Sequence, residues 1–102
     1  MRPTLFAFAL FLISGLAPAH AADATVTIEN FDFPMDVAVT PGSTVTWKNL
    51  DGEPHTVVSL DGAFRSPALD QDDSYSFKFD KPGVYKYICS IHPKMRATVT
   101  VK

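Results

Sequence analysis

Two patterns meet in the stretch Gly83-Val84-Tyr85-Lys86-Tyr87-Ile88-Cys89-Ser90-Ile91-His92-Pro93-Lys94-Met95. In its first half, Tyr85, Tyr87 and Cys89 occupy alternate positions, a period of two that is typical of a half-buried β-strand. In its second half, a cysteine, a histidine and a methionine follow one another at intervals of three residues. The strand that buries two tyrosine rings is therefore also expected to direct the Cys89 side chain toward the interior.

The same period of two recurs on the N-terminal and C-terminal sides of this stretch. The alternating apolar residues are Val26 and Ile28, Val37 and Val39, Val45 and Trp47, Tyr75, Phe77 and Phe79, and Val99 and Val101. Turn-forming pairs such as Pro41-Gly42 and Pro82-Gly83 separate these segments, and no segment carries the start and stop signals of a long helix. Closely spaced strands in so short a chain predict an all-β fold, an antiparallel Greek-key β-sandwich of two sheets.

The first 21 residues have the pattern of a secretory signal peptide. A basic start at Arg2 precedes an apolar run over residues 5–16, and Ala19-His20-Ala21 supplies the small residues of a cleavage site. The alternative, an uncleaved membrane anchor, is disfavoured because the apolar run is too short to span a bilayer. We expect cleavage of residues 1–21, which leaves one domain, residues 22–102, in the periplasm and not attached to the membrane.

The balance of charge excludes some classes of function. The chain has 9 Lys and Arg residues against 11 Asp and Glu residues, with a formal net charge of −2 at pH 7. Without a basic patch in the sequence or a phosphate-binding loop, the chain is not expected to bind nucleic acid. It also pairs no nucleophile with a base outside the residues discussed next, so we predict that it is not an enzyme.

The ligand-type residues of the predicted domain form one set. Cys89 is the single cysteine, and His55 and His92 are the histidines that remain once residues 1–21 are removed. A lone cysteine forms no internal disulfide, so a bound metal is one candidate for stabilising the domain, and a buried free thiol is the alternative. Two imidazoles, a thiolate and a weak axial methionine form a mononuclear blue-copper centre. We expect one copper ion at His55, Cys89, His92 and Met95.

The chain resembles the cupredoxins, and among them the amicyanin family. Three segments carry the resemblance: Thr40-Pro41-Gly42-Ser43-Thr44-Val45-Thr46-Trp47-Lys48-Asn49, then Pro54-His55-Thr56-Val57, and residues 83–95 with their Cys-x2-His-x2-Met spacing and the proline after the second histidine. The resemblance covers nearly all of residues 22–102. It implies a sandwich of the cupredoxin type.

The resemblance also implies roles for individual residues. His55, Cys89 and His92 would be the equatorial copper ligands and Met95 the axial one. Asn49 would tie the two ligand-bearing loops together, although the interpretation of Asn49 as an ordinary turn residue before Leu50-Asp51-Gly52 stays open.

These roles predict a one-electron carrier, because four protein ligands leave no open metal position for a substrate. The resemblance implies that electrons pass through the exposed edge of His92, inside a ring of apolar residues. The candidates for that ring are Pro54, Pro93, Ala68, Leu69 and Met35. The alternative function is copper trafficking, in which the protein buffers or delivers copper through the same soft ligands.

The expected partners are redox proteins: a periplasmic dehydrogenase, a c-type cytochrome or a reductase. We expect the carrier to work as a monomer. Lys94 stands inside residues 89–95, which we call the ligand loop, at a position where amicyanins have an aromatic residue. Its charge is therefore expected to affect docking more than copper affinity.

Overall fold

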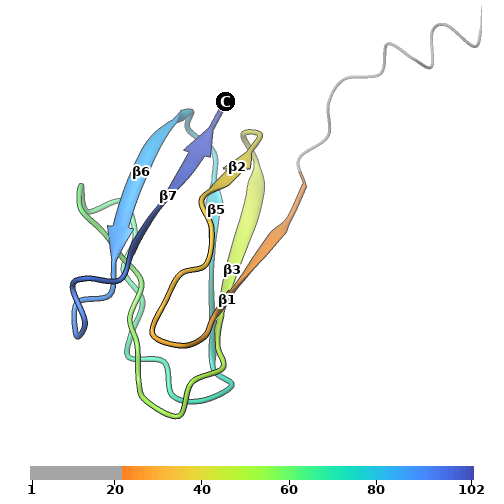
Figure 1. Ribbon diagram of the computed structural model, residues 1–102. Coiled ribbons are helices and arrows are strands. Elements are labelled where there is room, and N and C mark those ends of the chain that lie inside the picture. Colours follow the sequence, from red (N-terminus) through yellow and green to blue (C-terminus); the bar gives the residue numbers. More distant parts are fainter. Residues whose placement is uncertain (1–21) are drawn as a thin grey trace, which may run out of the picture.

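The structure, a computed structural model, describes residues 22–102, and the predicted signal peptide lies outside the described residues. Within this range the chain forms two sheets that pack face to face (Figure 1). The first sheet has the order β1 (Ala24–Ile28), β3 (Ser43–Asn49), β5 (Ser74–Phe79). The second has the order β2 (Val37–Val39), β7 (Arg96–Val101), β6 (Gly83–Ile88), β4 (Val58–Ser59).

The predicted all-β sandwich is confirmed, and the pairing inside it is mixed. Strands β3 and β5, β4 and β6, and β6 and β7 pair antiparallel, whereas β1 and β3, and β2 and β7, pair parallel. Parallel neighbours need a crossover connection. The chain makes the first crossover by passing through β2 in the facing sheet on its way from β1 to β3 (Figure 1).

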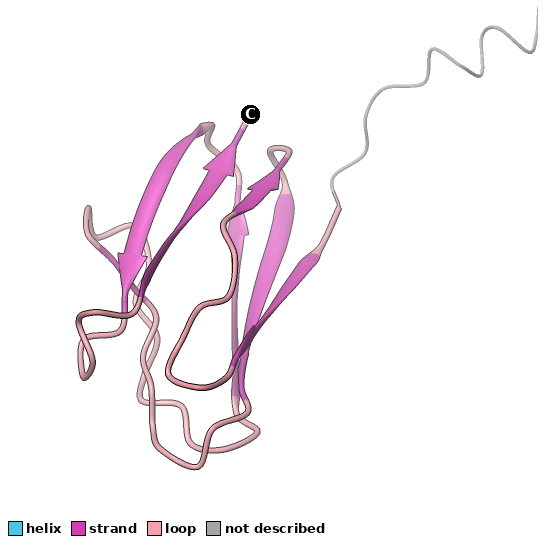
Figure 2. Ribbon diagram, viewed as in Figure 1, coloured by secondary structure: helices cyan, strands magenta, loops and turns pink. Residues whose placement is uncertain are grey.

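Strands and loops make up the whole described range, as Figure 2 shows. Among residues 22–102 no helix is long and apolar enough to cross a membrane. The six alternating segments of the sequence are β1, β2, β3, β5, β6 and β7, and β4 is an additional strand of two residues.

The core between the sheets is aromatic. The fully buried Trp47 ring stacks on Phe64 at a centroid distance of 5.5 Å and meets Tyr87 edge to face at 5.4 Å. Phe79 is also buried and lies 5.4 Å from Phe64. Each such ring removes a large apolar surface from water, a gain of about 2–3 kcal/mol per side chain. This core holds the two sheets at a fixed spacing.

The loops at one end of the sandwich carry the ligand-type residues. Strand β3 ends at Asn49, and the loop that follows brings His55 toward the facing sheet. Strand β6 ends at Ile88, and residues 89–95 form the turn into β7 at the same end (Figure 1). Two segments far apart in sequence therefore meet there on rigid supports.

Candidate metal centre

The structure brings together three of the four residues that the sequence predicts as ligands. The ligand atoms of His55, Cys89 and His92 all lie within 4.8 Å of one another. The Sγ atom of Cys89 lies 3.7 Å from Nδ1 of His55 and 3.7 Å from Nδ1 of His92. His55 and Cys89 are fully buried, whereas His92 is partly exposed.

The spacing and chemistry of these three donors fit one metal ion. Metal–sulfur and metal–nitrogen bonds of about 2.3 Å and about 2.0 Å, about 120° apart, place sulfur and nitrogen about 3.7 Å from each other. This is the separation that both imidazoles show from Cys89. A thiolate with two imidazoles is a donor set that suits copper.

The surroundings of Cys89 favour its thiolate form. Burial raises the pKa of the thiol, but the amide N–H of Thr56 and the His55 and His92 rings outweigh burial and lower the pKa to about 6. The Thr56 amide nitrogen lies 3.4 Å from the sulfur, to which it donates. A metal ion binds cysteine as the thiolate. Because the lowered pKa favours the thiolate of Cys89 at neutral pH, a metal displaces few protons when it binds there.

Met95 lies at the end of the loop that carries Cys89 and His92. Two backbone hydrogen bonds close this loop: the Cys89 amide donates to the Met95 carbonyl at 3.1 Å, and the Met95 amide donates to the His92 carbonyl at 2.9 Å. The Met95 side chain is buried. The sulfur-bearing side chains at the two ends of the loop are thus both inside the protein, while Pro93 and Lys94 between them are exposed.

Thr56 links the loop that carries His55 to the ligand loop, residues 89–95. Its hydroxyl oxygen accepts the amide N–H of Ser90 at 2.8 Å and lies 2.8 Å from the Ser90 hydroxyl. Asn49 is fully buried, but its amide group donates to the carbonyls of Glu53 and Leu69, each at 2.8 Å. Asn49 was expected to tie the two ligand-bearing loops together, and this expectation is corrected. Its side chain links the segment before His55, at Glu53, to the segment at Leu69, and it makes no hydrogen bond to residues 89–95.

Asp51 orients His55 and was not singled out in the sequence. Its Oδ2 lies 2.8 Å from Nε2 of His55, so the other ring nitrogen, Nδ1, faces Cys89. The same carboxylate accepts the amide N–H groups of Asn30 at 2.8 Å and Phe31 at 2.9 Å. Burial raises the pKa of Asp51, but the Phe31 amide, the His55 ring and the Asn30 amide together lower it below its usual value.

Phe31 is the second residue that the sequence analysis missed. Its ring meets the His55 ring edge to face at 5.2 Å and the His92 ring at 5.0 Å, and 48 % of the residue remains exposed. Asn30 and Phe31 both have positive φ angles, 57° and 56°. A non-glycine residue at positive φ is uncommon, and the Asp51 carboxylate holds both residues in this conformation.

The rim around His92 differs in part from the expected one. Leu69 is only 2 % exposed and lies in the core, and its backbone pairs with that of His55. Met35 is exposed, as are Pro93 and Ala68, and Pro54 is partly exposed. Phe31 and Ile91 add exposed apolar surface near the ligand loop that the sequence did not assign to the rim.

Replacing Asp51 with alanine is expected to destabilise the folded protein by about 2 kcal/mol, because three hydrogen bonds to one carboxylate are lost. Urea unfolding measures the loss. Asp23→Ala is the matched control, since the Asp23 carboxylate accepts a single amide N–H, from Thr44, on an exposed surface. If the two variants unfold at the same urea concentration, Asp51 is not an anchor of the site.

Known proteins match both the sequence and the structure. The family model described as a cupredoxin-like domain matches residues 3–101. The amicyanin of Paracoccus versutus is 36 % identical over 127 residues, covering 100 % of this chain and 96 % of its own. Amicyanin-alpha of Methylorubrum extorquens is 36 % identical over 91 residues, covering 84 % of this chain and 76 % of its own.

Two solved structures extend the comparison. A mutant of amicyanin in its Cu(I) form has a TM-score of 0.74 at 30 % identity, with 78 % of this chain and 82 % of the other covered. A purple cupredoxin from Nitrosopumilus maritimus has a TM-score of 0.71 at 37 % identity, with 78 % of this chain and 100 % of the other covered. Together with the donor set and its spacing, these matches show that the chain belongs to the cupredoxin-like family, resembles the amicyanins, and has one copper ion as its cofactor.

Proposed function

We propose that this protein is a periplasmic one-electron carrier, with His55, Cys89 and His92 as equatorial copper ligands and Met95 as the axial ligand. The observation that carries the proposal is the gathering of two imidazoles and a thiolate within 4.8 Å, at a site where Cys89 is fully buried. Copper bound there supplies the Cu(I)/Cu(II) couple. The predicted signal peptide supports the location, and residues 1–21 are proposed to be removed on export.

The residues around the site support electron transfer because they hold the donors in place. Thr56 fixes the ligand loop, and Asp51 fixes the His55 ring. Donors that do not move between oxidation states keep the rearrangement that accompanies electron transfer small. The partly exposed His92 ring is where a partner approaches the site most closely, and Phe31 lies against it.

The same features weigh against an enzyme and against copper trafficking. A set of four protein ligands leaves no open coordination position for a substrate. A buried cysteine and a buried histidine do not offer the exposed soft ligands that favour ready exchange of copper. The partner is proposed to be a redox protein, namely a periplasmic dehydrogenase, a c-type cytochrome or a reductase, and the carrier a monomer.

Voltammetry of the copper-loaded protein in the presence of a Cu(I) chelator tests this function. A carrier should pass one electron per chain reversibly over repeated cycles and keep its copper, because the buried ligands hold both oxidation states. Rapid loss of copper to bathocuproine disulfonate on the first reduction would instead assign the protein to copper delivery.

Lys94→Glu is expected to slow oxidation of the reduced protein by hexacyanoferrate(III) about fivefold at low salt, because a positive charge beside His92 becomes negative. The difference should shrink as the salt concentration rises. Lys78→Glu is the control, since Lys78 lies on β5 of the other sheet and is also exposed. Stopped-flow absorption measures both rates, and equal rates for the two variants at every salt concentration would remove Lys94 from the approach surface.

A further inference from the structure

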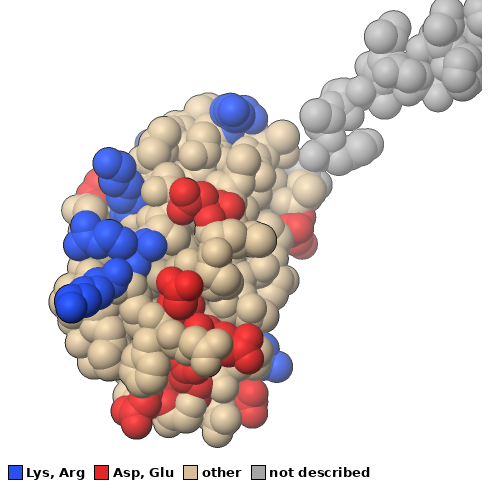
Figure 3. Space-filling view, viewed as in Figure 1, with Lys and Arg blue, Asp and Glu red and all other residues tan. Residues whose placement is uncertain are grey.

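Positive charge gathers on one face of a protein whose formal net charge is −2. Figure 3 shows several Lys and Arg side chains grouped on the side where β6 and β7 lie, whereas others lie apart at the top and the lower right of the view, and the acidic side chains are mostly outside the group. The sheet register accounts for part of this grouping. Arg96 pairs with Ile88, Ile88 pairs with Val58, and Val58 pairs with Arg65, so these four residues form a row across the sheet.

The row lies on the outer surface of the second sheet. Its neighbours along the strands, such as Tyr87 and Ala97, are buried, whereas Arg65 and Arg96 are exposed. Lys86 stands two residues before Ile88 and is exposed on the same face, because side chains alternate along a strand. We call Arg65, Lys86 and Arg96 the basic face.

The charges of the basic face are not neutralised by ion pairs within the described residues. The ion pairs there join His55 to Asp51 and Lys78 to Asp80. Two acidic residues adjoin the basic face, and each accepts a backbone amide: Asp36 that of Thr98, and Asp61 that of Ala63. Arg96 donates to the Pro93 carbonyl at 3.3 Å, a bond that does not neutralise its charge, so the three cations remain available to the carboxylates of another molecule.

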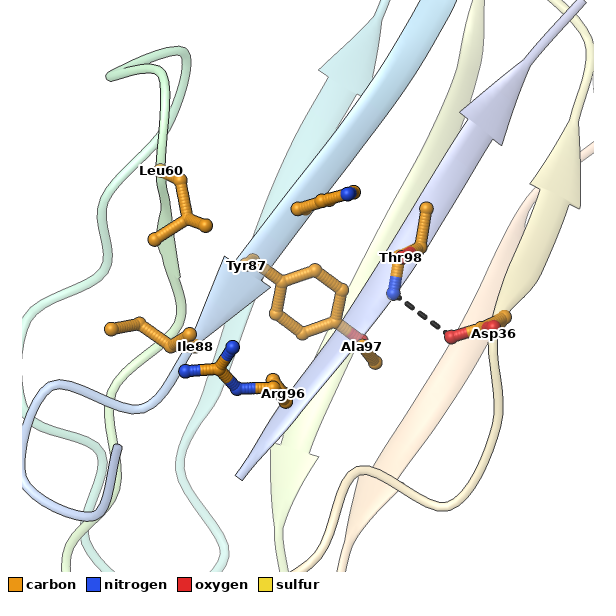
Figure 4. Close-up of a pocket in the computed structure, with 8 residues that line it drawn as sticks. Asp36, Leu60, Tyr87, Ile88, Arg96, Ala97 and Thr98 are labelled. Carbon is orange, nitrogen blue, oxygen red and sulfur yellow. Dashed lines mark hydrogen bonds between the residues drawn. The ribbon is translucent and has the colours of Figure 1, made fainter. Parts of the chain in front are cut away.

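The basic face also has a shallow hollow with an apolar part. A cavity of about 290 Å³ lies between Leu60, Ile88, Lys86 and Arg96, with Asp36 at its far side (Figure 4). Leu60 is 60 % exposed, and Val84 beyond it is 62 % exposed. Apolar side chains surrounded by polar and charged ones are the usual make-up of a transient protein interface, and a small apolar side chain of a partner fits this space.

The basic face is connected directly to the metal centre through the chain. Ile88 is followed by Cys89, and Arg96 is preceded by Met95. A partner bound to this face would contact Ile88 and Arg96, and each of these residues is the immediate neighbour in sequence of a proposed copper ligand. The route does not pass through His92, which lies on the ligand loop beyond Cys89.

We propose that the outer face of β4, β6 and β7 is a second docking surface, and that its occupant is an acidic redox protein whose carboxylates pair with Arg65, Lys86 and Arg96. This inference rests on the proposed function as an electron carrier. One electron passes between the carrier and the partner's redox centre, so oxidation of one is balanced by reduction of the other. The positive charges of the basic face favour binding of an acidic protein over a basic one.

The position of the surface is tested by nuclear magnetic resonance on the reduced, diamagnetic protein with hexacyanochromate(III) as a paramagnetic anionic probe. Amide signals of residues 58, 65, 86–88 and 96 should broaden, in addition to those around Lys94, which is expected to attract a similar anion. Broadening centred on another group of cations, such as Lys78 and Lys81, would overturn the assignment. This map requires no electron transfer, so it remains interpretable even if the protein proves not to be a carrier.

The partner class is tested with c-type cytochromes of acidic and of basic isoelectric point, each reduced from Fe(III) to Fe(II) as the carrier loses one electron. The double variant Lys86→Gln/Arg96→Gln should reduce the acidic cytochrome at least about fivefold more slowly than wild type at low salt, with the gap closing as salt rises. The control Lys78→Gln/Lys81→Gln should keep the wild-type rate. Wild-type rates for the double variant, or stronger binding of wild type to phosphatidylglycerol vesicles than to the acidic cytochrome, would overturn the proposal.

Discussion

Cys89→Ser is expected to abolish the intense visible absorption of the copper-loaded protein and to leave the sandwich folded. The absorption arises from charge transfer between thiolate sulfur and Cu(II), and Cys89 is the single cysteine of the chain. Serine is similar in size but is a poor ligand for copper. The buried hydroxyl can accept the Thr56 amide that now donates to sulfur, so the cost in stability is about 1–2 kcal/mol. Visible absorption and far-ultraviolet circular dichroism measure the two effects separately.

Met35→Leu serves as the matched control for this variant. Met35 is a sulfur-bearing residue that is 58 % exposed and lies away from the ligand loop in sequence. It should keep the full colour of the wild type. A coloured Cys89→Ser protein, or a colourless Met35→Leu protein, would mean that the wrong sulfur has been assigned to copper.

Removal of copper is expected to lower the melting temperature by about 15 °C or more. Copper joins segments 34 residues apart and binds the folded chain, so at a free copper concentration of about a thousand times the dissociation constant it adds about 4 kcal/mol. For a domain of this size each kcal/mol shifts the melting temperature by about 4–8 °C. The apo protein should still fold, because the Trp47 and Phe79 rings are buried whether or not metal is bound.

Thermal melts followed by circular dichroism measure the difference between apo and copper-loaded protein. Cys89→Ser protein mixed with copper is the control and should melt at nearly the same temperature with and without the metal. Identical melting curves for the two forms of the wild type would show that metal binding does not join the His55 segment to the ligand loop.

The alternation of apolar residues was sufficient to predict six of the strands. Val45 and Trp47, for example, lie on the inner face of β3 with polar residues between them. The two-residue strand β4 was missed because two residues cannot display a period. The parallel pairing of β1 with β3 was missed because alternation reports which face a side chain takes and carries no information about the direction of the neighbouring strand.

The ligand-type residues were predicted because three of them share a short loop and the fourth is the other remaining histidine. The residues that support them were harder to find. Asp51 precedes a glycine and resembles a turn residue in sequence, and its partners Asn30 and Phe31 lie about twenty residues away on a loop without a period. The alignment of Arg65 with Arg96 could not be predicted from the sequence either, because it depends on how the strands pair.

Optical absorption and electron paramagnetic resonance spectra of the copper-loaded domain, residues 22–102, test the proposed site most directly. Ligation by His55, Cys89, His92 and Met95 predicts one copper per chain, an intense blue colour that disappears on reduction and returns on oxidation, and a narrow copper hyperfine splitting. A weakly coloured Cu(II) protein with a wide hyperfine splitting would contradict it, because copper would then be bound without the Cys89 thiolate.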